Sequence, residues 1–145
     1  MPDILHQVTI QSDANHIYDA LTTSEGFHKW WTKDGASTDE VGQSVEARFY
    51  GGQVEFKLQV EKSDPGKALE WSVISAVPGW EDTRITWDMS PSEQGGTDLL
   101  LGHRDWKSTD GLYAPVSYNW AWYLTSLKWY LEKGKGIPHP EENEA

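Results

Sequence analysis

One histidine stands out among the residues that could do chemistry. His103 ends an alternating run after Leu99 and Leu101, so its imidazole should point to the same side of a strand as those apolar side chains. At a cavity, an imidazole could hydrogen-bond a polar ligand group or act as an acid–base, with Arg104 or Tyr113 assisting. Alternatively, His103 is a structural residue with satisfied ring nitrogens. We favour this second interpretation because a near-neutral pKa alone does not make a catalyst.

Other patterns that could carry catalysis or bind metal are missing from the sequence. His103-Arg104-Asp105 matches the core of a kinase catalytic loop, but no glycine-rich loop, strand lysine or Asp-Phe-Gly accompanies it. The five histidines are dispersed, cysteine is absent, and no Gly-x-Ser-x-Gly motif occurs. We therefore assign no catalytic residue, expect no metal and no cofactor, and consider a binding protein better supported than an enzyme.

Nine tryptophans are a surplus for a chain of 145 residues. Several of them fall at strand-like or helix-like spacing, which predicts that they face one interior. Their rings could line a ligand cavity, or they could simply fill a close-packed core, and the sequence leaves both possibilities open. The candidate ligand-binding residues are Trp31, Phe49, Phe56, Trp71, Trp87, His103, Trp106, Tyr113, Trp120 and Tyr123.

The elements that must position these side chains follow from hydrophobic periodicity. The clearest alternation covers residues 54–61 and marks a strand with one buried and one wet face. Similar runs cover residues 4–11, 45–49, 69–73, 84–89 and 99–103, and short Gly- or Pro-containing turns separate most of them. Two short helices are expected after the first strand, one capped by Ser12 or Asp13 and one from Ser24 to Trp31.

The longest predicted helix lies near the C-terminus. An apolar stripe at 3.6-residue spacing runs from Val116 to Leu131, Pro115 suits the first turn, and Gly134 and Gly136 end the helix. A one-sided antiparallel sheet must cover its apolar face. We therefore predict an α+β fold in which a curved antiparallel sheet of about six strands wraps around this helix. Residues 1–136 form one domain and residues 137–145 an acidic, Pro-containing tail.

A second aromatic row lies on the opposite side of the long helix. Tyr118, Trp122 and Trp129 fall away from the core stripe, so they should face solvent. Exposed aromatic side chains in a row suggest a protein contact, and we predict that these three residues form a homodimer interface. Isolated exposed rings beside polar neighbours are the alternative.

Bulk composition limits the possible partners. The net charge of −11 repels phosphate backbones, so no nucleic-acid partner is expected. No apolar window is long enough for a membrane span, and no secretory signal is visible at the N-terminus. The default expectation is a cytoplasmic protein.

Several segments resemble the START-like (SRPBCC) superfamily, and within it the AHSA-type family of homologues of the heat-shock-protein ATPase activator. The resemblance covers about residues 4–135, and it is carried by the order and spacing of IYDALTT (17–23), WW (30–31), LEW (69–71), TRITW (83–87), GGTDLLLGH (95–103) and residues 120–131. It implies a helix-grip fold with a hydrophobic cavity between the sheet and the long helix.

Superfamily resemblance does not imply a single function, because members carry lipids, bind hormones, cyclise polyketides or assist a chaperone. Our first hypothesis is binding of a small hydrophobic or aromatic molecule in a Trp-lined cavity. The second is a protein-interaction module acting as a chaperone cofactor in the stress response, although nothing here corresponds to the additional N-terminal domain of the eukaryotic activator. The third is a cyclase- or hydrolase-type enzyme that uses His103.

Overall fold

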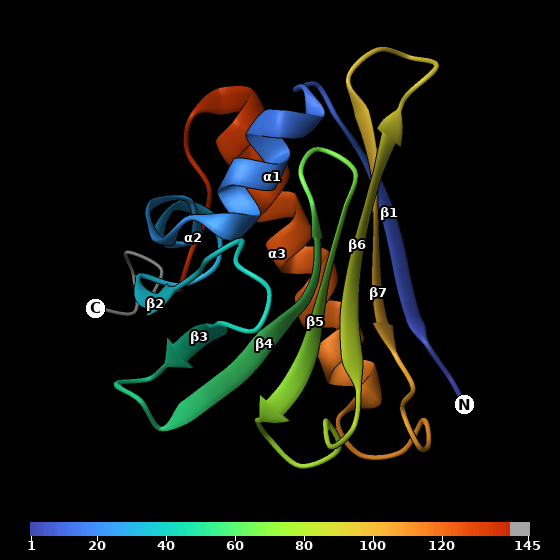
Figure 1. Cartoon of the computed structure of the whole chain (residues 1–145). Helices are drawn as coiled ribbons and strands as arrows, with labels where there is room; N and C mark the ends of the chain where they lie inside the picture. Colours follow the sequence, from blue (N-terminus) through green and yellow to red (C-terminus); the bar gives the residue numbers. More distant parts are fainter. Residues whose placement is uncertain (140–145) are drawn as a thin grey trace.

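A seven-stranded antiparallel sheet curves around the longest helix of the protein (Figure 1). The computed structural model describes residues 1–139. Across the sheet the strands follow the order β1-β7-β6-β5-β4-β3-β2. The strands are β1 (Ile4–Ile10), β2 (Asp34–Ala36), β3 (Ser44–Phe49), β4 (Val54–Asp64), β5 (Ala68–Ser75), β6 (Arg84–Pro91) and β7 (Thr97–Arg104), and the helices are α1 (Ala14–Thr22), α2 (Ser24–Trp30) and α3 (Tyr113–Lys133).

This architecture confirms the predicted fold class, with one strand more than the alternation indicated. The additional strand is β2, which has three residues and pairs with β3 through Gly35 opposite Ala47. Asp34-Gly35 reads as a helix break in the sequence because three residues are too few for a period-2 pattern. A side chain at Gly35 would place its Cβ 2.9 Å from the carbonyl oxygen of Glu46, so glycine permits this close pairing.

The two short helices begin at residues that cap them. The Asp13 side chain accepts a hydrogen bond from the His16 N–H, and Thr23 accepts one from the Gly26 N–H. These bonds satisfy backbone donors that a helix start leaves free. A Cβ at Gly26 would lie 2.7 Å from the Ala20 Cα, so this glycine lets α2 turn closely against α1.

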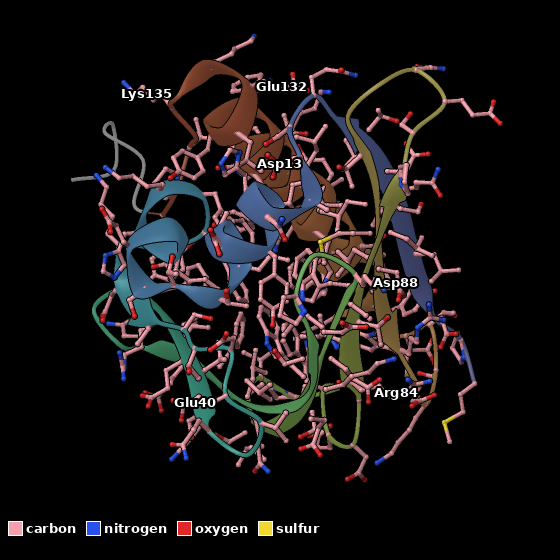
Figure 2. All side chains as sticks on the ribbon, turned by 45° about the horizontal axis from the view of Figure 1, so that its top comes forward. Asp13, Glu40, Arg84, Asp88, Glu132 and Lys135 are labelled. Carbon is pink, nitrogen blue, oxygen red and sulfur yellow. The ribbon has the colours of Figure 1, made fainter. Side chains whose placement is uncertain are left out.

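Tryptophan rings fill the centre of the domain between the helices and the sheet. Trp30 and Trp31 at the end of α2 stack with ring centroids 5.5 Å apart, and Trp31 also stacks on Trp71 of β5 at 6.2 Å. Trp87 of β6 meets Trp120 of α3 edge-on at 5.8 Å. Figure 2 shows side chains crowding this space, while Arg84 and Asp88 lie on the outer side of β6. The core is therefore largely aromatic.

Polar contacts hold α3 beside the edge strand β1. Lys128 Nζ donates to the backbone carbonyl of Thr9 at 2.5 Å, and the Gln11 N–H donates to Glu132 Oε2 at 2.7 Å. The His6 ring lies 3.1 Å from the carbonyl of Ser117. The first two contacts occupy backbone groups of an edge that could otherwise pair with another strand, and all three hold α3 beside β1.

The chain beyond α3 packs back onto α2. The Ile137 N–H donates to Ser126 Oγ at 2.7 Å, and the His139 N–H donates to the Trp31 carbonyl at 2.8 Å. His139 also forms a parallel bridge with Thr32. Residues 137–139, which the sequence groups with the tail, thus contact α3 and the residue that follows α2. Residues 140–145 of that tail lie outside the described part of the chain.

Candidate functional site: an aromatic cavity

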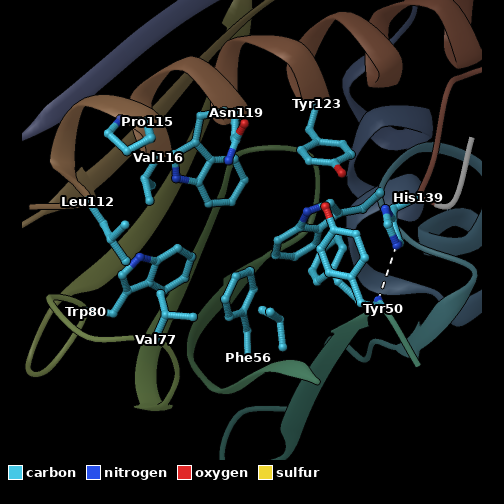
Figure 3. A pocket seen from close by; sticks show the side chains of 14 residues that line it. Tyr50, Phe56, Val77, Trp80, Leu112, Pro115, Val116, Asn119, Tyr123 and His139 are labelled. Carbon is cyan, nitrogen blue, oxygen red and sulfur yellow. Dashed lines mark hydrogen bonds between the residues drawn. The ribbon is translucent and has the colours of Figure 1, made fainter. Parts of the chain in front are cut away.

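A cavity of about 280 Å³ remains between α3 and the side of the sheet that carries the β3–β4 hairpin (Figure 3). We call it the aromatic cavity, because aromatic side chains form most of its wall. It is lined by Trp31, Phe49, Tyr50, Val54, Phe56, Val77, Trp80, Leu112, Pro115, Val116, Asn119, Trp120, Tyr123 and His139.

Separate segments of the chain bring these side chains together. The β3–β4 hairpin supplies one wall, the loop between β5 and β6 supplies a second, and the start of α3 covers both. Phe56 and Trp80 stack across two of these segments, with ring centroids 4.3 Å apart and planes at 22°. On the inner side, Trp31 lies 5.4 Å from Trp120. The cavity is therefore bounded by flat aromatic surfaces.

The polarity of the wall changes from the inside to the mouth. Trp31, Trp80 and Trp120 are almost fully buried, whereas Tyr50 is 63% exposed and Asn119 is also exposed. Among residues 1–139, no Asp, Glu, Lys or Arg lines the cavity. The interior can therefore desolvate an apolar ring, and the mouth can hydrogen-bond a neutral polar group.

Tyr50 and His139 close one side of the aromatic cavity. The Tyr50 N–H donates to His139 Nε2 at 3.3 Å, and the two rings meet edge-on at 4.6 Å (Figure 3). Tyr50 has a φ of 56°, a left-handed conformation that is uncommon for a tyrosine. Gly51 and Gly52 follow it with positive φ and complete the hairpin turn. The backbone conformation of the hairpin thus directs the Tyr50 side chain toward the mouth of the aromatic cavity.

His103 lies behind the cavity wall and is fully buried. Trp120 Nε1–H donates to its Nδ1 at 3.1 Å, so Nδ1 carries no proton. Nε2 therefore carries the proton and donates to Thr83 Oγ1 at 2.9 Å, and Thr83 in turn donates to the Trp80 carbonyl at 2.7 Å. Burial lowers the pKa of His103 to about 3, so the ring is neutral at physiological pH.

This geometry gives His103 a structural role. Both ring nitrogens are engaged by protein groups, and His103 does not line the aromatic cavity. An acid–base catalyst needs a nitrogen within reach of the reacting group. The hypothesis of an enzyme that uses His103 therefore has no support from the site. Instead, the imidazole connects Trp120 to the Trp80 loop, and both tryptophans are cavity walls.

The structure separates the predicted ligand-binding residues into two groups. Trp71 and Trp87 are fully buried in the core, and Trp106 is 2% exposed. The Tyr113 hydroxyl donates to the Asp3 carbonyl at 2.8 Å, and its ring packs edge-on against Trp106. These four residues and His103 lie outside the cavity wall. The predicted residues that do line it are Trp31, Phe49, Phe56, Trp120 and Tyr123.

Several lining residues were absent from the predicted set. Trp80 follows Pro78-Gly79 in the loop between β5 and β6, and its ring is buried, 2% exposed, and forms a wall of the cavity. Asn119 lies one residue before Trp120 on the long helix. Helical spacing from Trp120 could therefore have predicted Asn119 at the mouth of the cavity. His139 carries no sequence signal, because its position depends on the folding back of the chain after α3. The remainder are Tyr50, Val54, Val77, Leu112, Pro115 and Val116.

The second aromatic row is exposed, as expected from its helical spacing. Tyr118 is 71% exposed, and Trp122 and Trp129 are each 39% exposed. We call these three residues the outer row of α3. Lys133 Nζ lies 5.3 Å from the centroid of the Trp129 ring, within the range of a cation–π contact. The row is a separate surface from the aromatic cavity, on the other side of the helix.

Within residues 1–139, no three His, Cys, Asp or Glu side chains lie together in a way that could hold a metal ion. None of the helices in this part of the chain has the length and hydropathy that a membrane span requires.

A curved antiparallel sheet that grips a C-terminal helix around an aromatic cavity defines a START-like helix-grip domain. The chain belongs to the family described as "Activator of Hsp90 ATPase homolog 1-like protein", whose model matches residues 11–132. This confirms the family resemblance of the sequence. A search of curated proteins gave no match.

Solved structures agree with this assignment. The solution structure of the Aha1 dimer from Colwellia psychrerythraea is 35% identical, with a TM-score of 0.85, and the match covers 94% of this chain and 100% of that one. The protein SSP2350 from Staphylococcus saprophyticus is 20% identical with a TM-score of 0.78, covering 94% and 96% of the two chains. CalU16 from Micromonospora echinospora is 18% identical with a TM-score of 0.70, covering 90% and 74%. The similarity to the last two proteins shows a shared fold and nothing about function.

Proposed function

We propose that this protein binds a small hydrophobic or aromatic molecule in the aromatic cavity. The observation that carries the proposal is a cavity of about 280 Å³ beside a core whose other tryptophans are packed ring on ring. Protein interiors are normally close-packed, and empty space lined by apolar side chains costs stability. A retained cavity with aromatic walls and a polar mouth is typical of a ligand site.

A pair of variants that add the same side chain tests this proposal. Val77→Phe places a ring in the cavity wall, whereas Val41→Phe places one at a position that is 62% exposed and outside the wall. We expect a compact aromatic compound such as 2-naphthamide to quench tryptophan fluorescence and raise the melting temperature of the wild type and Val41→Phe. Val77→Phe should bind at least about tenfold more weakly. Equal affinity of both variants would show that the compound binds outside the aromatic cavity.

A second candidate function is protein interaction through the outer row of α3. The family description names an ATPase activator, and a relative 35% identical to this chain was solved as a dimer. The exposed rings of Trp122 and Trp129 provide the anchors that interfaces commonly use. We propose a homodimer through this row, and a chaperone as the heterologous partner. Such a role would place the protein in the cytoplasm and in the stress response.

The chaperone partner can be tested with purified proteins. A chaperone ATPase from the same source would be captured on immobilised wild-type protein and on Trp122→Ala, and its ATPase rate would be measured with each. We expect capture and stimulation by the wild type and a loss of both with Trp122→Ala. No capture by the wild type would remove the chaperone partner and leave the homodimer and ligand binding unaffected.

A further inference from the structure

We infer that the aromatic cavity selects a compact, uncharged aromatic molecule and rejects carboxylates. This inference rests on the proposed ligand-binding function and specifies the chemical class of the ligand. It depends on three properties of the wall: its size, the flat rings that form it, and its lack of charge.

The size of the cavity favours a compact ligand. A volume of about 280 Å³ lies just below the range of roughly 300–1,000 Å³ that is usual for small-molecule sites. The inner end is closed by Trp31 and Trp120, which are 2% and 3% exposed. A molecule of one or two fused rings fits this space, whereas a long acyl chain would have to leave through the mouth.

The shape of the wall favours a flat ligand. Phe56 and Trp80 form a stacked pair on one side, and Trp31 and Trp120 are tilted by 38° to each other on the inner side. Aromatic rings pack best against other rings in offset or edge-on contact. These surfaces therefore suit a planar ring better than a branched aliphatic molecule of similar size.

The electrostatics of the wall disfavour an anion. Over residues 1–139, the lining contains no side chain of Lys or Arg that could pair with a carboxylate. Arg48 precedes the lining residue Phe49, but its guanidinium is held by Glu46, Asp34 and Glu55. A buried carboxylate without a partner pays a large desolvation penalty. The net charge of −11 opposes the approach of an anion as well.

The mouth of the cavity fits one neutral polar group on the ligand. Asn119 is exposed at the mouth, and its amide can both donate and accept a hydrogen bond. An amide or phenol could therefore be bound there without any charge. The ligand class that satisfies all these features is a one- or two-ring aromatic molecule with a single uncharged polar substituent.

Three matched compounds test the inference: 2-naphthamide, 2-naphthoate and 2-(aminomethyl)naphthalene. They share one ring system and differ in charge at neutral pH. By isothermal titration calorimetry with the full chain, we expect 2-naphthamide to bind at least about tenfold more tightly than 2-naphthoate. It should also bind more tightly than the ammonium compound, because no Asp or Glu side chain among residues 1–139 lines the cavity to pair with a buried ammonium.

A variant that introduces a positive charge supplies an independent readout. Asn119→Lys places a cation at the mouth, and Ala121→Lys places the same charge at an exposed position of α3 outside the wall. We expect Asn119→Lys to tighten 2-naphthoate about threefold to tenfold and to weaken 2-naphthamide, because the added charge pairs only with the carboxylate and the hydrogen bonds of the Asn119 amide are lost. Ala121→Lys should behave like the wild type.

The outcomes separate this inference from the proposed function. Tightest binding of 2-naphthoate or of the ammonium compound would overturn the selectivity for uncharged ligands and still leave a ligand-binding cavity. Equal affinity for all three would overturn it in the same way. Binding of none of the three would overturn the proposed function, and the inference with it.

Discussion

His103 holds two walls of the aromatic cavity through its two ring nitrogens. Trp120 donates to Nδ1, and Nε2 donates to Thr83, whose hydroxyl bonds the carbonyl of Trp80. A buried polar group costs stability unless it is hydrogen-bonded, and this imidazole has a partner on each side. One neutral side chain thus connects α3 to the β5–β6 loop.

The titration of His103 gives a prediction at the scale of the residue. Burial lowers its pKa to about 3 from the ordinary 6.5, so the unfolded chain takes up the proton first as the pH falls. The contribution of neutral His103 to the free energy of unfolding is complete above about pH 6.5, and it is lost progressively as the pH falls toward about 3. We expect this residue to add about 1.4 kcal/mol per pH unit to the slope of the unfolding free energy in that window.

Urea unfolding of the wild type and His103→Gln between about pH 4 and about pH 7.5 measures this contribution. Glutamine can accept from Trp120 and donate to Thr83 but does not titrate. The variant should be less stable at neutral pH and should lose stability less steeply below about pH 6.5. Parallel curves for the two proteins would show that His103 is not held neutral in the folded state.

At the scale of elements, the C-terminal segment completes the cavity wall. His139 pairs with Trp31 and Lys33 through its backbone, and its ring packs on Phe49 and Tyr50. A segment after the last helix thus anchors the β3–β4 hairpin, which carries Tyr50 at the mouth. The position of this hairpin depends on contacts far apart in sequence.

Removing the His139 ring should loosen this wall. His139→Ala deletes the acceptor for the Tyr50 N–H and the ring contact with Phe49, so we expect a loss of about 1–3 kcal/mol in the free energy of unfolding. Pro138→Ala is the control, since it retains the His139 ring, and it should change stability by less than about 1 kcal/mol. Equal losses in urea unfolding would mean that the His139 ring is not what stabilises this side of the cavity.

The sequence predicts these elements unevenly. Alternation defines β4 and the apolar stripe defines α3, because each signal spans many residues with one buried face. The strand β2 has only three residues, so no periodicity could reveal it. The same limit applies to the site: periodicity finds Phe56 and Trp120, which point inward, but it cannot separate them from Trp71 and Trp87, which point inward into packed core.

At the scale of the whole molecule, we propose a different function for each of the two aromatic faces of α3. The inner face covers the cavity through Val116 and Trp120, and the outer row presents Tyr118, Trp122 and Trp129 to solvent. Ligand binding and self-association would then use opposite sides of one helix. The sequence predicts that the sheet curves around α3, but the cavity volume depends on contacts between residues far apart in the chain, which local sequence patterns do not encode.

Self-association through the outer row gives a prediction about the molecule in solution. Trp122→Glu places a charge in the centre of the proposed dimer contact, where burying an unpaired carboxylate is unfavourable. We expect the wild type to sediment as a dimer and Trp122→Glu as a monomer. Gln94→Glu adds the same charge at an exposed turn and should remain dimeric. A monomeric wild type, or a dimeric Trp122→Glu, would contradict the proposed interface.

The central claim is that a ligand occupies the space between α3 and the sheet. Nuclear magnetic resonance of the indole N–H groups tests it directly, since the tryptophans report from both sides of the helix. On titration with 2-naphthamide, we predict shifts for Trp31, Trp80 and Trp120, which line the cavity, and none for Trp122 and Trp129. Shifts confined to Trp122 and Trp129, or no shift at all, would contradict the account.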